Sequence, residues 1–395
     1  MIVDPIANPY RPGAGRRPPV LAGRQPLLDS FEVVRHRAET YGEGDRSWIL
    51  NGRRGVGKTV LLNELWTQVS GRGWISAKVE ASYHVPFPVV LAKALVQAMR
   101  TATGRHPVPK LRRLLGVFQA FSLKVDPALG LVSLGAEVDL VKGVADSGRL
   151  GDDLTALLQV LGETSADLGI GTLLLVDELQ EAKPDELTAI NMAIHQLGQG
   201  PTPLPVMLVG AGLPSLPTQL GEATSYAERL YDYRAIGLLD PPAARLALVG
   251  PTSELGVTWD DDAIDAALTR AGGYPYFLQS IGKHVWDSAR TSPITLEDVE
   301  VGLRFAREEL DDGLYRTRWE RATPAQRALL RALATEGGDE PVTMAALATA
   351  TGRKRTTDLS VARNELIKKG LVYPPERGYI AFTVPGMGEF ILREE

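Results

Sequence analysis

The stretch GRRGVGKT at residues 52–59 constrains this chain more than any other feature of its sequence. It fits the pattern G-x-x-x-x-G-K-[ST], and it lies between an apolar strand predicted at 47–50 and a helix predicted from Lys58. Glycines let backbone N–H groups curl around phosphate oxygens, and the positive end of the following helix adds to the attraction. In such a loop the lysine reaches the β- and γ-phosphates and the Thr59 hydroxyl binds Mg²⁺. The sequence therefore predicts a phosphate loop formed by Gly52, Arg53, Arg54, Gly55, Val56, Gly57, Lys58, Thr59 and Val60.

A second signal, TLLLVDE at 172–178, is an apolar strand that ends in two carboxylates. In combination with a phosphate loop, Asp177 is predicted to hold Mg²⁺ through water, and Glu178 to act as the general base on the attacking water. The alternative is a strand that ends at the carboxyl edge of the sheet, where ligands gather in any case. The second carboxylate favours a hydrolase of this type over a P-loop kinase or a small GTPase.

The amino-acid composition excludes several other kinds of site and classes of protein. The 395 residues include no Cys and five His, which excludes disulfides, thiolate zinc sites and cysteine nucleophiles. The net charge of −5 argues against a protein that coats nucleic acid over its whole surface, although it leaves room for a local basic region. The opening residues resemble no signal peptide, and the longest apolar run is too short to span a bilayer. We therefore expect a cytoplasmic protein without membrane contact.

The order of predicted elements indicates an α/β fold. Strands are predicted at 47–50, 74–80, 171–177, 204–210 and 231–239, with helical patterns between them, as a parallel sheet with crossover helices requires. We expect an extended arm over 1–18, a P-loop core over 19–240, a helical lid over 241–321 and a third unit over 322–395. A β-hairpin is predicted near 121–138, either as a cover over a sheet edge or as a contact for a partner protein.

Two further short motifs carry a resemblance to a known family. PVLAGRQ at 19–25 resembles the V-G-R-E box that contacts adenine, and GYPYFLQ at 273–279 resembles the G-x-P motif of a helical lid. With the phosphate loop and the acidic pair, the chain resembles AAA+-type ATPases, close to origin-initiator-like and archaeal-type ATPases and to the STAND branch. The resemblance implies ATP bound between core and lid, with Gly23, Arg24, Tyr274 and Pro275 near the nucleotide, and a homo-oligomer whose assembly depends on nucleotide.

The chain departs from that pattern in two places. Val209, Gly210, Ala211 and Gly212 stand where the family has a polar sensor-1 residue, with Ser215 as the nearest hydroxyl, and the lid motif lacks a sensor-2 arginine. These departures predict slow or partner-dependent hydrolysis. The resemblance places a trans-acting arginine finger just before the fifth strand, where Arg229 and Arg234 are the candidates. The alternative for each is an ordinary surface or ion-paired arginine.

The last unit has the pattern of a winged helix-turn-helix. Three helices are predicted from Thr323, at 343–352 and at 357–370, followed by strands at 370–373 and 379–384, as in the C-terminal domain of origin initiators. Residues 353–369 carry six basic and two acidic side chains. The predicted contacts with duplex DNA are Arg353, Lys354, Arg355, Arg363 and, at the wing, Arg377. We expect a nucleotide-controlled, oligomerising DNA-binding ATPase. The alternative is a regulatory switch whose winged helix and hairpin contact protein partners.

Overall fold

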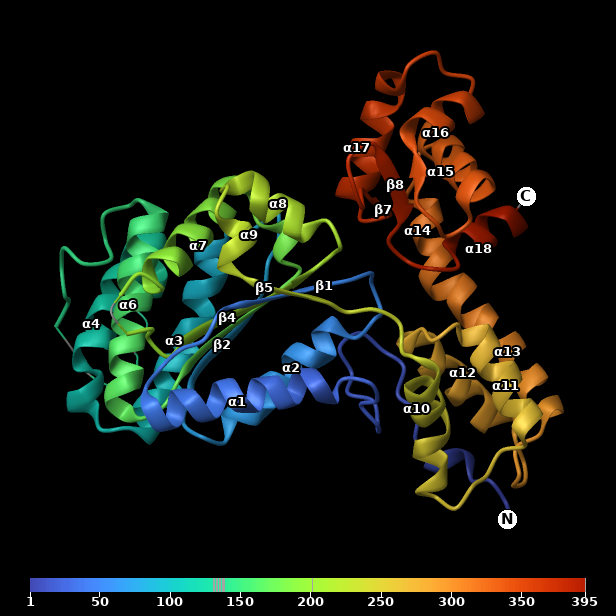
Figure 1. Cartoon of the computed structure of the whole chain (residues 1–395), viewed down its shortest axis with the longest axis horizontal. Coiled ribbons are helices and arrows are strands. Elements are labelled where there is room, and N and C mark those ends of the chain that lie inside the picture. Colours follow the sequence, from blue (N-terminus) through green and yellow to red (C-terminus); the bar gives the residue numbers. More distant parts are fainter. Residues whose placement is uncertain (131, 133, 135, 137–138, 201, 395) are drawn as a thin grey trace.

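The computed structural model describes residues 1–130, 132, 134, 136, 139–200 and 202–394. Figure 1 shows an α/β core on the left, a helical lid at the lower right and a small C-terminal body above the lid. The buried apolar side chains form one large cluster in each of these three bodies. No helix in the described ranges is long and apolar enough to cross a membrane.

The core contains the parallel five-stranded sheet predicted from the sequence. Its order is β2 (Ile75–Glu80), β3 (Thr172–Asp177), β4 (Val206–Gly212), β1 (Trp48–Asn51) and β5 (Asp232–Ala235). Every neighbouring pair is parallel. β3 and β4 are buried along their whole length, as expected for strands covered on both faces. Only β4 separates β1 from β3, so the phosphate loop and the acidic pair emerge close together at the carboxyl edge.

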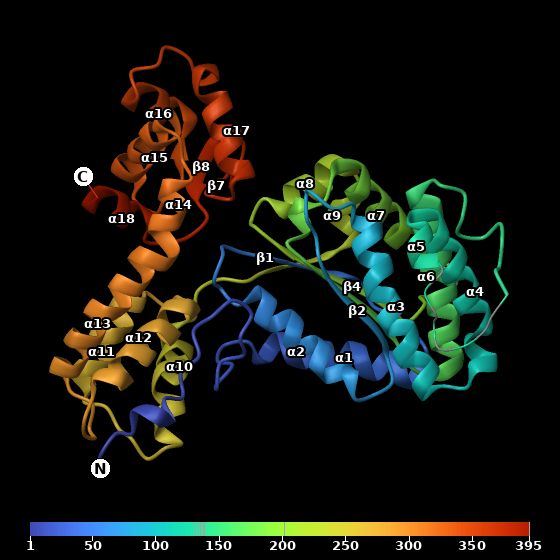
Figure 2. The same ribbon diagram turned by 180° about the vertical axis from the view of Figure 1, so that it is seen from behind.

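Helices cover both faces of this sheet. Figures 1 and 2 show α1 and α2 on one side, and α6, α7 and α8 on the other. The helices of the core are α1 (Gln25–Tyr41), α2 (Lys58–Ser70), α3 (Phe87–Arg105), α4 (Val108–Val125), α5 (Pro127–Gly130), α6 (Leu150–Leu168), α7 (Pro184–Leu197), α8 (Leu216–Ala223) and α9 (Ala227–Leu230).

The prediction of a β-hairpin near 121–138 is wrong for its first strand. Residues 121–125 are the last turn of α4, and α5 occupies the predicted turn. Leu114, Phe118 and Phe121 recur at intervals of three and four residues and are all buried, which is the spacing of a helix face and not of a strand. The second arm, 131–138, falls largely outside the described residues.

The lid consists of four helices: α10 (Pro241–Ser253), α11 (Asp261–Ala271), α12 (Pro275–Ser288) and α13 (Leu296–Leu310). The N-terminal arm contains one short turn, η1 (Pro5–Ala7), and packs on the lid by burying Val3 and Tyr10 in its apolar cluster. α13 continues through a π-helical turn, η3 (Asp311–Arg316), into α14 (Thr317–Glu320). This long helical segment connects the lid to the C-terminal body.

The C-terminal body has the helix order and the small antiparallel sheet of a winged helix, as predicted. Its sheet order is β6-β8-β7. The elements are α15 (Pro324–Gly337), β6 (Val342–Thr343), α16 (Met344–Ala350), η4 (Thr356–Leu359), α17 (Ser360–Lys368), β7 (Val372–Tyr373), β8 (Tyr379–Phe382) and α18 (Met387–Arg393). The sequence reading missed β6, which is two residues long, and α18.

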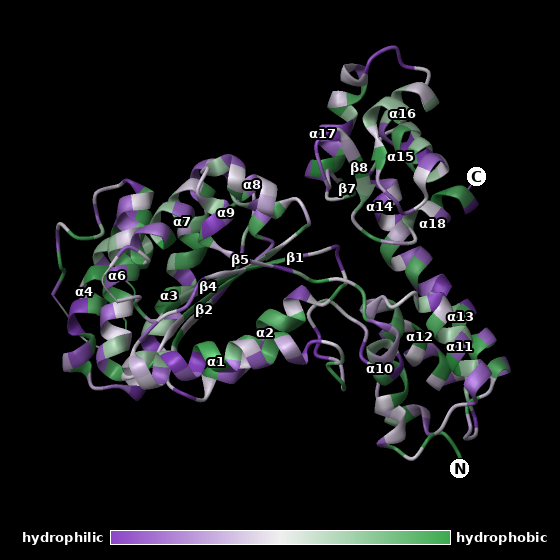
Figure 3. Ribbon diagram, viewed as in Figure 1, coloured by the Kyte–Doolittle hydropathy of each residue, from purple (hydrophilic) through white to green (hydrophobic). Residues whose placement is uncertain are grey.

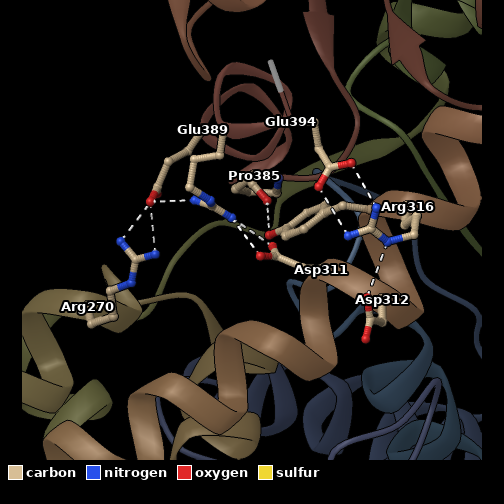
Figure 4. Close-up of polar contacts among 9 residues, drawn as sticks. Arg270, Asp311, Asp312, Arg316, Pro385, Glu389 and Glu394 are labelled. Atoms are coloured by element: carbon tan, nitrogen blue, oxygen red, sulfur yellow. Dashed lines mark hydrogen bonds and ion pairs between the residues drawn. The ribbon is translucent and has the colours of Figure 1, made fainter.

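Charged side chains at the end of the chain join this body to the lid (Figure 4). Glu389 of α18 pairs with Arg270 of α11 at 3.2 Å, and Arg393 pairs with Asp311 of the π-helical turn at 2.8 Å. Tyr315 adds a hydrogen bond from its hydroxyl to the carbonyl oxygen of Pro385, at 2.7 Å. Lid and winged helix are therefore connected both through the chain and through ion pairs.

Candidate nucleotide site

The phosphate loop leaves β1 and enters α2 through a backbone path that depends on glycine. Gly55 and Gly57 have φ values of +79° and +98°, a region that other residues rarely adopt. Gly55 also faces Tyr274 of the lid so closely that a Cβ at this position would lie 2.9 Å from the ring. The motif therefore supplies both a curled backbone and room for the lid.

Lys58, the first residue of α2, lies under this loop. Its Nζ donates hydrogen bonds to the carbonyl oxygens of Gly52 and Arg53, at 2.8 and 2.9 Å. Only 6% of the residue is exposed, and this burial lowers the pKa of the Lys58 amine to about 8, although the charges of Glu178 and Asp177 act in the opposite direction. The amine is thus a poorly hydrated cation held by neutral carbonyls.

Thr59 and Asp177 meet where α2 begins and β3 ends. The Thr59 hydroxyl donates to Asp177 Oδ2 at 2.6 Å. Both side chains are predicted to hold Mg²⁺, Asp177 through water, and in the structure they are in direct contact.

Glu178 follows Asp177 in a strained conformation, with φ at +49°, which is rare for a residue with a side chain. Its carboxylate is bound on two sides. Arg54 of the phosphate loop forms an ion pair with it at 3.1 Å, and Gln180 donates from Nε2 at 2.5 Å. Gln180 also accepts, through Oε1, from the backbone N–H of Leu213 just after β4. Sequence reasoning missed Gln180, because no motif singles it out.

A cavity of about 350 Å³ lies above the loop, between core, lid and N-terminal arm. Arg24 lies in its wall and donates to the carbonyl oxygens of Val56 and Gly237, and burial lowers the pKa of its guanidinium, against the opposing charge of Asp240. Tyr274 and Pro275 also line the cavity. Gly23 instead packs towards Ala243 of the lid.

The arm contributes a wall that the sequence reading did not predict. Residues 11–16 line the cavity, and the carbonyl oxygen of Gly15 accepts a hydrogen bond from Asn63 of α2 at 3.0 Å. At its other end, the Arg11 N–H donates to Gln279 of α12. The sequence of the arm contains no motif that would predict this position, because the position depends on contacts with residues far away in the chain.

The polar atoms around this cavity fit a polyanion. Arg54 Nε and the Tyr274 hydroxyl are buried without a hydrogen-bond partner among the described residues. Six cationic residues of the described chain line the same space: Arg11, Arg16, Arg24, Arg54, Lys58 and Arg318. Buried donors and cations of this number need an acceptor, and phosphate oxygens meet that need.

Other predicted site residues lie elsewhere. Ser215 is buried before α8 and lines a second cavity instead of the first. Arg229 is exposed on α9. Arg234 lies within β5, pairs with Asp232 at 2.8 Å and stacks 3.6 Å above the Trp48 ring. Arg229 is therefore accessible to a neighbouring molecule, whereas contacts within its own chain hold Arg234.

The five predicted DNA contacts fall into two groups. Arg353, Lys354 and Arg355 are exposed in the hydrophilic connection between α16 and α17 (Figure 3). Arg363 and Arg377 line the second cavity, of about 650 Å³, whose opposite wall is α8 of the core. Part of the predicted DNA-binding face is therefore turned toward the core.

The winged helix also contacts the phosphate loop itself. The backbone N–H of Arg54 donates to the carbonyl oxygen of Thr383 at 3.2 Å. Beside it, Leu213 of the core packs with Tyr373 and Ala381 of the wing in a small buried cluster. The loop is thus in contact with the arm, the lid and the winged helix.

Comparisons with known proteins agree with this architecture. Residues 20–209 match the AAA ATPase domain family, and residues 312–391 match a family described as a domain of unknown function. The chain is 26% identical over 272 residues to the Holliday junction branch migration complex subunit RuvB of Saccharopolyspora erythraea, covering 65% of this chain and 73% of that protein.

One solved structure extends the likeness in fold over nearly the whole chain. A Walker-type ATPase of Pyrococcus abyssi aligns with a TM-score of 0.58 at 15% identity, covering 97% of this chain and 98% of that one. The Orc1 protein of Aeropyrum pernix, solved in complex with DNA, aligns with a TM-score of 0.47 at 18% identity, covering 96% and 94%. The residues that match the AAA ATPase domain family include the phosphate loop and the acidic end of β3.

Proposed function

We propose that this protein is a magnesium-dependent ATPase in which bound nucleotide controls a DNA-binding winged helix and self-assembly. The observation that carries the proposal is the position of Arg54. Its side chain pairs with Glu178, and its backbone N–H binds Thr383 of the winged helix. One residue of the phosphate loop thus contacts both the proposed general base and the proposed DNA-binding unit.

ATP and Mg²⁺ would lie between the core and the lid. Lys58 and the loop amides would bind the phosphates, Thr59 and Asp177 would hold Mg²⁺, and Arg24 and Tyr274 would border the nucleotide. Mg²⁺ neutralises charge on the transferred phosphate when it is bound. Glu178 would accept a proton from the attacking water once Arg54 no longer holds its carboxylate. Arg229 of a neighbouring copy would complete the site.

The first experiment compares Lys58→Ala with Glu178→Gln. Lys58→Ala should abolish binding of a fluorescent ATP analogue, since the variant lacks the buried cation. Glu178→Gln should keep nucleotide binding but stop turnover, because an amide cannot accept the proton. If the Lys58 variant binds with wild-type affinity, the nucleotide site is wrongly assigned.

The second experiment addresses the winged helix. Changing Arg353 and Lys354 to Ala should weaken binding to duplex DNA and reduce its salt dependence, because each lost phosphate contact lowers the slope by about one. The control changes Arg304 and Glu308 to Ala. These two exposed residues lie one turn apart on α13, far from the connection between α16 and α17.

A second candidate function is a switch whose winged helix binds a protein. It is favoured by Arg363 and Arg377, which line a cavity shared with α8 instead of an open face. Absence of any salt-dependent DNA binding, in the presence of ADP or of an ATP analogue, would support this alternative. Mass measurement in solution with each nucleotide tests the proposed assembly.

A further inference from the structure

Arg318 is a cation in the nucleotide cavity that no motif of the sequence predicts. It lies on α14, directly after the π-helical turn, and its side chain lines the cavity together with Leu314 of that turn. Its Nη1 donates to the carbonyl oxygen of Leu314 at 3.2 Å. π-helical turns inside longer helices are frequent at functional sites, since they change the direction of the side chains that follow.

The surroundings of Arg318 are unfavourable for a cation. Among the described residues, no carboxylate lies within ion-pair distance of its guanidinium. Burial lowers the pKa of Arg318, and the nearby charges of Arg54 and Arg321 lower it further. A half-buried arginine that is near other cations is stabilised when an anion enters the cavity that it lines.

The position of Arg318 along the cavity indicates which part of a nucleotide it would meet. The lining of the cavity includes apolar side chains, among them Val20, Leu239 and Ala247, which suit a base. Arg318 lies instead near Arg54, which holds Glu178 beside the Thr59–Asp177 pair. Phosphate chemistry is expected beside Glu178, Thr59 and Asp177, so the proximity of Arg318 to Arg54 favours a phosphate as its ligand.

Resting on the function proposed above, we propose that Arg318 binds the terminal phosphate of the nucleoside triphosphate. It would thereby supply the cation that the G-x-P segment of α12 lacks. The next residue, Trp319, is buried in the apolar cluster of the winged helix, and its carbonyl oxygen accepts from Arg327 of α15. A phosphate held by Arg318 is therefore held by the segment that carries the winged helix.

The test is the ratio of affinities for a non-hydrolysable ATP analogue and for ADP, measured on the full chain. Arg318→Ala should weaken binding of the ATP analogue by about ten- to a hundredfold, the range for losing a charged hydrogen bond. ADP, which lacks the terminal phosphate, should bind within about twofold of wild type. Arg318→Lys should restore part of the difference, because it restores the charge without the planar fork.

Arg321→Ala is the matched control. Arg321 carries the same charge, lies three residues after Arg318 and has an exposed side chain. It should leave both affinities unchanged. Thermal unfolding without nucleotide separates a structural role from a binding role. The Arg318→Ala variant should unfold at the wild-type temperature or above it, because an unpaired, desolvated cation is removed.

Two results would overturn the proposal for Arg318 while leaving the function intact. One is an unchanged affinity ratio in Arg318→Ala; the other is an equal loss of ATP-analogue and ADP binding in a variant that unfolds earlier. Failure of the proposed function would look different, because wild type itself would then bind neither nucleotide or Lys58→Ala would bind both normally.

Discussion

Arg54 and Thr383, which are more than three hundred residues apart in the chain, share a backbone hydrogen bond of 3.2 Å. The donor lies in the phosphate loop and the acceptor in the winged helix. Phosphates bound by the loop would compete for the same N–H groups, so nucleotide and winged helix are expected to influence one another.

Leu213 tests whether the winged helix rests on the core in solution. Only 6% of the residue is exposed, and it packs with Tyr373 and Ala381. Leu213→Asp places a charge in this contact and should weaken it by about 2 kcal/mol or more, as expected for an unpaired buried polar group. We expect a larger radius of gyration in small-angle scattering and tighter binding to duplex DNA, because Arg363 and Arg377 would no longer share a cavity with α8.

Leu246→Asp is the control for that experiment, since Leu246 is 52% exposed on the lid. It should change neither the radius nor DNA binding. An unchanged radius in Leu213→Asp would mean that the Leu213 contact does not hold the two bodies together.

Lys58 should make stability depend on pH in metal-free, nucleotide-free buffer. Its pKa is about 8 in the folded protein and 10.5 as the ordinary value. Between these values the unfolded chain binds the proton and the folded chain does not, so the free energy of unfolding rises as pH rises from 8 to 10.5. The difference between the two pKa values corresponds to a change of at most about 3.4 kcal/mol in the free energy of unfolding.

The measurement is chemical denaturation across this pH range for wild type and for Lys58→Met. The difference between the two curves isolates Lys58 from other groups that titrate in the same range. Parallel curves would contradict the burial of a charged amine at this position.

Gly55 and Gly57 should respond differently to alanine. Both have positive φ, so either substitution costs roughly 1–2 kcal/mol of backbone strain. Gly55→Ala adds a collision with the Tyr274 ring, whereas a Cβ at Gly57 would find nothing within 4 Å. In the absence of nucleotide, Gly55→Ala should therefore have the lower unfolding temperature. Equal unfolding temperatures would show that the Tyr274 ring does not pack closely against residue 55.

Arg229 and Arg234 can be distinguished as trans-acting residues by the dependence of ATPase rate on protein concentration. Arg229→Ala should remove the rise in specific activity at high concentration, since the exposed side chain is available to a neighbour. Arg234→Ala should instead lower the unfolding temperature, because it loses the stacking on Trp48 and the pair with Asp232. If only the Arg234 variant loses the concentration-dependent activity, the assignment is reversed.

Local sequence patterns determined much of this molecule. The phosphate loop, the five strands and the helix order of the winged helix could all be read from spacing and residue type, because each depends on neighbours along the chain. The direct contact between Thr59 and Asp177 was not predicted, because it depends on the order of β3, β4 and β1 in the sheet. The hairpin prediction failed because the apolar pattern at 121–125 is short enough to fit either a strand or a helix. The preceding residues of α4 are needed to recognise the helix.

Only the tertiary structure decided which distant residues share the site. No motif marks Gln180, the arm residues 11–16 or Arg318. They line the cavity above the phosphate loop or contact Glu178 because the arm, the lid and the winged helix fold around the loop. The same packing holds Arg234 over Trp48 and turns Arg363 toward α8. Sequence fixes a residue's chemistry and its local element, whereas the partners that it meets depend on how separate bodies are packed.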